Sequence, residues 1–398
     1  MRRSLLLFGL GVAWMACGGS VDVAGGPSAT TSSSSSGAGG GGTGGAGVAG
    51  AAPDVATFLA TIELPGAVAG MAYDATAHEL WVSTQDPTTS MSTGLVAVDG
   101  TTDEVSAPIV TTAVGDVAVL PALGKVYVAH SSAVGDAVVT VFDEATKAEK
   151  STITAAKAGG ADWIAADHVR NRVFVFTDPF ATPTNQSSIV VIDGKTDAVV
   201  ATVPVGTNAF TGLGVAKQID VSTPDGKVWV VGGGNGTPVK VVEFDQATNT
   251  VTMTTTVASK GNPNGIAAML SDAAVVVHDV ATGAGTLSLV GPLTVALPAG
   301  FVPYDVDYSS AGPGAIRVWG SFNGTPLVLL CTTPGCNQTG SATVKVGTIN
   351  PSWTIPTVMG GEPVGSFGQT VYLDMIPDPD MGVPPPEVQK VQLTIGHW

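Results

Sequence analysis

Short runs of β-forming residues, separated by turn residues, recur along most of this chain. One pattern is an apolar strand, a tight turn and a second apolar strand that ends near an aromatic residue or Val. It occurs four times, at residues 70–83, 116–130, 162–176 and 219–231. Each occurrence predicts a pair of antiparallel strands.

A second pattern follows each of these pairs about 25 residues later. Two or three β-formers are followed by Asp, two further residues and Thr, and the aspartates are Asp99, Asp143, Asp193 and Asp245. They are spaced 44, 50 and 52 residues apart. An Asp side chain at the start of a tight turn can accept hydrogen bonds from the turn amides, so each motif predicts a hairpin.

Two strand pairs in succession make a four-stranded antiparallel meander whose two faces both need cover. Radial stacking of several meanders supplies that cover. Meanders start near residues 70, 116, 162, 219, 265 and 305, and a degenerate unit runs from 351 to 398. The sequence therefore predicts an all-β fold, a single β-propeller with seven four-stranded blades. Six and eight blades are the alternatives, because residues 347–368 carry no clean repeat.

The two ends of the predicted ring are each incomplete. Residues 60–66 resemble residues 201–206, the outer strand of the third unit, yet no strands precede them. The last unit stops after a third strand. Since an open ring would leave sheet edges and apolar faces exposed, we predict that residues 58–64 pair with 388–395 and close the ring.

Residues 190–206, VVIDGKTDAVVATVPVG, resemble the repeat of the YVTN-type β-propeller family. The resemblance covers residues 58–257. Residues 264–297 and 303–346 keep the strand pairs but are expected to lose the Asp-x-x-Thr turn. The resemblance allows a surface-tethered binding protein, and also an enzyme, because some propellers of this type are lactonases or lyases.

The first residues carry the signals of export. Arg2 and Arg3 precede an apolar stretch at residues 5–16, which has the length of a signal peptide and is too short to span a bilayer stably. The stretch ends in Trp-Met-Ala followed by Cys17, which resembles the lipobox of bacterial lipoproteins, although Trp14 departs from the aliphatic residue usual there. The resemblance implies cleavage after residue 16 and lipidation of Cys17; an ordinary secretory peptide cut elsewhere is the alternative.

Residues 17–52 then form a Gly/Ser-rich segment that holds almost no large apolar side chain. Such a segment cannot bury enough surface to offset the entropy of ordering it, so we expect a flexible tether. The predicted organisation is a signal peptide at 1–16, a lipidated tether at 17–52 and a propeller at 53–398. We expect the protein to be anchored in the bacterial cell envelope, at the outer membrane or cell surface, with the membrane contacted only through lipid.

Charge excludes one class of partner. The chain of 398 residues has a formal net charge of −16, and Arg2-Arg3 is its single basic cluster. Such a surface repels phosphate backbones, so nucleic acid is not an expected partner. We expect a monomer with a protein or a carbohydrate as ligand.

The remaining cysteines, Cys331 and Cys336, flank a Pro-Gly turn in CTTPGC. In an oxidising compartment this spacing predicts a local disulfide that replaces the Asp turn of the sixth blade. A redox or metal pair is the alternative, but the CxxC spacing is absent.

Candidate site residues lie where the innermost strands begin, beside the expected central channel. These positions carry Asp116, Asp162, Asp220 and Asp305. Converging carboxylates could bind a divalent cation such as Ca²⁺. The alternative is that they cap turns or face water in the channel. We expect no other cofactor.

Two functional classes remain open, since a fold does not settle a function. The first is a non-catalytic binding or interaction module, favoured by the lack of a catalytic motif. The second is an enzyme of lactonase or lyase type that uses a metal at the channel.

Overall fold

The computed structural model divides the chain into Met1–Gly50 and Ala51–Trp398. It describes residues 55–157, 160–178, 186–207, 218–234, 237–257, 261–269, 271–279, 281–290, 294–309, 315–322, 325–332, 338–343, 356–364, 368–375 and 387–394. The predicted signal peptide, Cys17 and the tether lie outside these residues, so they stay predictions.

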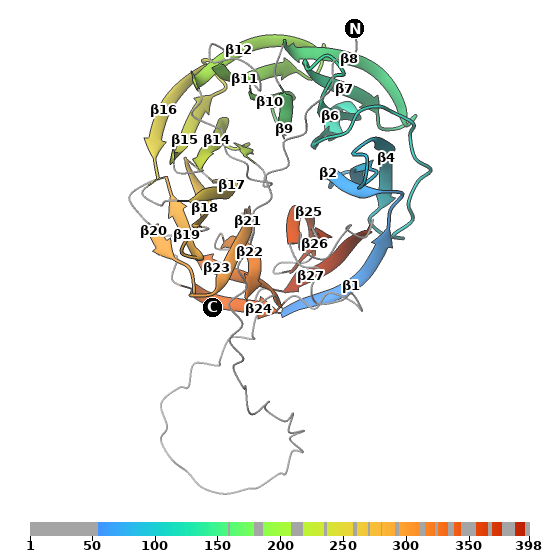
Figure 1. Cartoon of the computed structure of the whole chain (residues 1–398). Helices are drawn as coiled ribbons and strands as arrows, with labels where there is room; N and C mark the ends of the chain where they lie inside the picture. The colour runs from blue at the N-terminus through green and yellow to red at the C-terminus, as the bar shows by residue number, and fades with distance from the viewer. Residues whose placement is uncertain are drawn as a thin grey trace, which may run out of the picture. The chain divides into compact units, whose positions relative to one another are not determined.

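In the described part of Ala51–Trp398, the strands form seven antiparallel sheets. The sheets follow one another around a ring, and the last contacts the first (Figure 1). This arrangement is a single all-β propeller, as the repeats predict.

Five of the sheets are four-stranded meanders of consecutive strands. The first two consist of β5 (Val117–Leu120), β6 (Lys125–Ser131), β7 (Ala137–Asp143) and β8 (Ala148–Ala156), and of β9 (Gly160–Asp167), β10 (Arg172–Asp178), β11 (Gln186–Asp193) and β12 (Ala198–Thr207). The third consists of β13 (Ile219–Ser222), β14 (Lys227–Gly234), β15 (Thr237–Asp245) and β16 (Thr250–Thr256). The last two consist of β17 (Asn262–Met269), β18 (Asp272–Asp279), β19 (Ala284–Leu289) and β20 (Thr294–Ala296), and of β21 (Phe301–Ser309), β22 (Ala315–Phe322), β23 (Thr325–Thr332) and β24 (Gln338–Thr343).

A sixth sheet joins the first and the last of the described strands. It contains β25 (Pro356–Val364), β26 (Gly368–Met375) and β27 (Glu387–Thr394), and its outer strand is β1 (Val55–Glu63). In the antiparallel pairing of β1 with β27, Thr61 lies opposite Gln389. The predicted closure by an N-terminal strand is confirmed.

The remaining sheet departs from the expectation of four strands in every blade. It has only β2 (Ala67–Asp74), β3 (Glu79–Gln85) and β4 (Ser92–Asp99). Beyond β4 the chain makes just two isolated bridges, Leu95 with Ile109 and Val98 with Val105. Pro108 lies in this segment and has no N–H to give to a ladder, while the amides of Ser106 and Ile109 on either side of it still donate to β4.

The core is distributed between neighbouring sheets. Middle strands such as β6 and β14 read as almost continuous apolar runs because sheets pack against both of their faces. Outer strands face solvent on one side, and β16 accordingly alternates exposed and half-buried residues along its length. One apolar cluster, which includes Ile62, Leu64, Leu80 and Val388, joins the closing sheet to the β2–β4 sheet.

The predicted Asp turns form as expected. The carboxylate of Asp193, for example, accepts the amides of Lys195 and Thr196, both at 3.0 Å. The residue after each motif Thr then adopts a left-handed conformation; these residues are Asp103, Lys147, Asp197 and Asn249.

The expectation that residues 264–297 lose the Asp-x-x-Thr turn is wrong. Asp279 and Thr282 form one between β18 and β19, where the amide of Ala281 donates to Asp279 at 3.0 Å. The motif connects the second and third strands here rather than the third and fourth.

Helical structure is limited, in the described residues, to the short 3₁₀ turn η1 (Pro121–Leu123). No helix in that part of the chain is long and apolar enough to cross a membrane.

Candidate binding cavity at the centre of the ring

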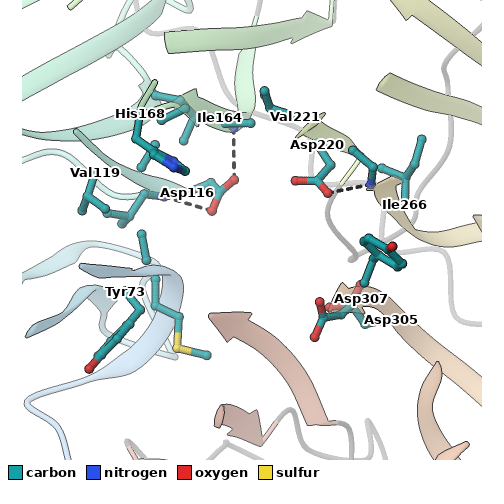
Figure 2. A pocket seen from close by; sticks show the side chains of 18 of the residues that line it. Tyr73, Asp116, Val119, Ile164, His168, Asp220, Val221, Ile266, Asp305 and Asp307 are labelled. Atoms are coloured by element: carbon teal, nitrogen blue, oxygen red, sulfur yellow. Dashed lines mark hydrogen bonds between the residues drawn. The ribbon is translucent and has the colours of Figure 1, made fainter. Parts of the chain in front are cut away.

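The innermost strands of six sheets surround a cavity of about 380 Å³ (Figure 2). These strands are β2, β5, β9, β13, β17 and β21. Each is paired on one side only within its sheet, so amides on its other edge need partners from elsewhere. The Asp side chains at the cavity satisfy part of this need.

Asp116 connects two neighbouring sheets at the cavity wall. It is 7% exposed, and its two carboxylate oxygens accept the amides of Val117 at 2.9 Å and of Ile164 at 3.0 Å. Ile164 belongs to β9, the inner strand of the next sheet. Close backbone packing also fixes this position, because a Cβ on Gly70 of β2 would lie 2.4 Å from the Asp116 Cα.

Asp220 makes an equivalent link from β13 to β17. Its Oδ2 accepts the amide of Ala268 at 2.7 Å. The two aspartates are not at equivalent places in their sheets, however. Asp220 lies opposite Trp229, and the matching position in the β5–β8 sheet is Ala118, opposite Tyr127.

Asp305 and Asp307 supply two further carboxylates from β21. Asp305 is 2% exposed and accepts the amide of Val306 at 2.8 Å, as Asp116 does with the residue that follows it. Asp307 forms an ion pair with Arg317, a buried side chain on β22 directly opposite. Asp307 therefore corresponds in register to Asp220, and Asp305 to Asp116.

Asp162 differs from the other three predicted site residues. Its backbone lies in β9 at a register shift, between Ala161 and Trp163. Its side chain lies outside the described residues, so the structure does not place it at the cavity.

Among the described residues, no three His, Cys, Asp or Glu side chains come close enough together to hold a metal ion. Asp116, Asp220 and Asp305 line the cavity, but each carboxylate engages a backbone amide. Binding of a divalent cation by these aspartates stays a prediction.

The cavity also has polar side chains that the repeats do not predict, namely His168, Tyr73 and Tyr308. No motif marks them; their place follows from strand register, which is known only from the structure. Among the described lining residues there are four aspartates, of which Asp307 pairs with Arg317, and neither Lys nor Arg. The cavity wall is therefore predominantly acidic.

The predicted disulfide is not shown. Cys331 lies in β23, and Cys336 lies outside the described residues. Their pairing stays a prediction.

No family model matches the chain, and no curated protein matches its sequence. Solved structures do resemble it. The RRP9 WD40 repeats align with a TM-score of 0.58 at 9% identity, covering 86% of this chain and 99% of theirs. A chain of the mitotic checkpoint complex aligns with a TM-score of 0.56 at 9% identity, covering 85% and 92%.

Kuenenia stuttgartiensis hydrazine synthase aligns with a TM-score of 0.52 at 16% identity, covering 68% of this chain and 77% of that one. The fold is a β-propeller. Identities this low establish the propeller architecture alone.

Proposed function

We propose that this chain is a non-catalytic binding protein whose propeller accepts a positively charged group in the central cavity. The observation that carries this proposal is the charge of the described lining residues, which include four aspartates, one of them paired with Arg317, and no Lys or Arg. Hydrogen bonds from backbone amides hold Asp116 and Asp220 in position before any ligand arrives. A preorganised carboxylate loses little freedom on binding, which favours recognition of a cation.

The size of the cavity favours a small group over a whole folded surface. At about 380 Å³ it falls near the lower end of ordinary ligand pockets. A lysine side chain or the amino terminus of a partner protein fits this chemistry. Resemblance to a propeller in the mitotic checkpoint complex is consistent with a protein ligand.

We further propose that the propeller is displayed at the bacterial envelope on a lipid anchor. Support comes from Arg2-Arg3, the apolar stretch at 5–16 and Cys17, followed by the Gly/Ser-rich tether. The repeat at 190–206, similar to the YVTN type, fits a tethered surface protein. Replacing Cys17 with Ser should move the protein out of the membrane fraction; metabolic palmitate labelling that survives the substitution would contradict lipidation.

Binding can be measured by calorimetry with two capped peptides that differ only at a central residue, lysine in one and norleucine in the other. We expect the lysine peptide alone to bind, with an affinity that falls as salt is added. Asp220→Asn should weaken binding several-fold. Asp143→Asn, at an exposed turn on the rim, is the matched control and should not affect it.

Equal binding of the two peptides, or of neither, would overturn the proposed recognition of a cationic group. Elemental analysis of the purified protein tests the alternative function, an enzyme that uses a metal at the channel. A stoichiometric, tightly held divalent metal would instead favour the metal-dependent enzyme.

A further inference from the structure

Two carboxyl groups meet at the boundary between the β2–β4 sheet and the β5–β8 sheet. Asp74, at the end of β2, is 1% exposed, and its Oδ1 accepts the amides of Thr76 at 2.6 Å and Ala77 at 2.9 Å. Its Oδ2 is also buried, and no N–H or O–H group of the described residues donates to it. A buried carboxylate oxygen without a donor is costly.

Glu144 provides the missing partner from the turn between β7 and β8. This half-buried side chain lies close enough to Asp74 for the two carboxyl groups to share a hydrogen bond, and the indole of Trp81 donates to its Oε1 at 3.3 Å. Two carboxyl groups can share a hydrogen bond only if one of them carries a proton. Burial, together with the hydrogen bond and charge of Asp74, raises the pKa of Glu144 to about 7.

The boundary between the β9–β12 and β13–β16 sheets shows the same arrangement without that proton. Asp167 ends β9 as Asp74 ends β2, and its Oδ1 accepts two turn amides. Its Oδ2 accepts the side-chain amide of Gln246 at 2.8 Å. Gln246 follows the motif Asp of its turn, as Glu144 does, so an amide donor occupies the place that a carboxyl group occupies in the first boundary.

Neighbouring charges do not replace the proton. Lys147 pairs with Glu79 at 2.6 Å and lies 4.2 Å above the ring of Trp81. On the same turn as Glu144, Asp143 pairs with Lys150. Lys125 begins β6, which pairs with β7, and it contacts Asp197 of the β9–β12 sheet. Further titratable side chains next to Asp74 in the chain are Tyr73, which precedes it, and His78, in the turn that follows it.

We propose that Asp74 and Glu144 form a proton-dependent latch between these two blades, closed while they share one proton and weakened when the proton is lost. The folded state binds this proton more tightly than the unfolded chain, because the pKa of Glu144 lies above its ordinary value of 4.5. The stabilisation is complete below the ordinary value and is lost as the pH rises through about 7. Strand β2, which ends at Asp74, also forms part of the cavity wall.

The latch can be tested on the full chain by thermal unfolding between about pH 5 and about pH 8. The wild-type melting temperature should fall over this interval by roughly 2 °C more than that of Glu144→Gln, whose amide donates at every pH. Glu149→Gln, an exposed carboxylate on β8, is the matched control and should keep the wild-type profile. Hydrogen exchange should place the change in β3 and the β7–β8 turn.

The reciprocal substitution Gln246→Glu should make the second boundary sensitive to pH. We expect a smaller change there, because Arg170 already contacts Asp167 at 2.8 Å. A Glu144→Gln protein with the wild-type pH profile would overturn the latch. So would a ¹³C titration showing the Glu144 carboxyl group ionised at pH values well below neutral. Neither result depends on a cavity ligand, so both are independent of the proposed binding function.

Discussion

Two boundaries between sheets are held by the same kind of contact. One, which we call the seam, lies between the closing sheet and the β2–β4 sheet. The other lies between the β5–β8 and β9–β12 sheets. At the boundary, Lys125 donates to Asp197 at 2.8 Å and to the Gly194 carbonyl at 2.7 Å. At the seam, Lys390 donates to Asp103 at 2.6 Å and to the Gly100 carbonyl at 2.7 Å. The seam joins residues 287 apart in sequence, and the boundary joins residues 72 apart.

The two contacts differ in where the lysine lies. Lys125 begins β6, the second strand of its sheet, whereas Lys390 lies within β27, the third strand of the closing sheet. The acceptor is the constant element: a left-handed residue directly after an Asp-x-x-Thr motif. At these two boundaries the turn thus offers the preceding sheet an acceptor, and in the closing sheet the third strand rather than the second supplies the lysine.

The largest expected effect comes from removing β1, the outer strand of the closing sheet. Deleting residues 53–66 removes β1 together with the buried side chains of Ile62 and Leu64, worth about 3–6 kcal/mol by apolar burial alone. We expect a sharp fall in melting temperature and aggregation through the exposed edge of β27. Shortening the segment 18–50 is the control and should leave melting unchanged. Similar melting of the two deletions would contradict closure.

Removing one lysine from each contact compares them directly. Lys125→Met should lower the free energy of unfolding by about 2–3 kcal/mol, because it leaves the Asp197 carboxylate, 19% exposed, without its cation. Lys390→Met should cost less, because the Asp103 side chain is 30% exposed and better hydrated. Denaturant unfolding measures both values, and a larger loss for Lys390→Met would reverse this ranking.

The boundary between the β2–β4 and β5–β8 sheets carries the same contact with its charges reversed, Glu79 on β3 and Lys147 in the turn. Glu79→Lys and Lys147→Glu should each lower stability by about 1 kcal/mol. The double substitution should recover part of that loss, since it restores an ion pair of the Lys125 type. Strictly additive losses in a double-mutant cycle would show that the two side chains do not interact.

A loss no larger than that of the charge reversals is expected at the turn that carries Asp197. Asp193→Ala removes the acceptor of two amides, so we expect a loss of about 1 kcal/mol. Asp193→Asn should retain most of the stability because its amide oxygen can still accept. Equal losses for the two substitutions, measured by thermal unfolding, would argue against a capping role.

The sequence predicts these turns because Asp and Thr act locally, on amides two and three residues away. It also predicts closure, since the missing strands at the two ends match. It does not predict that Lys125 reaches Asp197, because that contact depends on how two sheets pack. It does not predict the absence of a regular strand after β4, because Pro108 there has a counterpart, Pro204, inside the regular outer strand β12.

At the cavity, too, the sequence predicts some features and not others. Strand starts placed Asp116, Asp220 and Asp305 near the centre, and all three line the cavity. Their separate roles follow from register, since Asp220 lies two positions further along its strand than Asp116 does. A shift of this kind changes which amide a carboxylate reaches, and no spacing in the sequence reveals it.

Closure of the ring by an N-terminal strand is tested most directly by a cross-link between β1 and β27. Thr61 and Gln389 lie opposite each other in the β1–β27 pairing, so Thr61→Cys with Gln389→Cys, made with the native cysteines replaced by Ser, should form a disulfide within one chain. Thr61→Cys with Gln392→Cys is the out-of-register control, because Gln392 lies opposite Thr57, and it should not cross-link. The closed ring predicts an oxidised monomer for the first pair alone. Cross-linked dimers, or no disulfide at all in the folded protein, would contradict it.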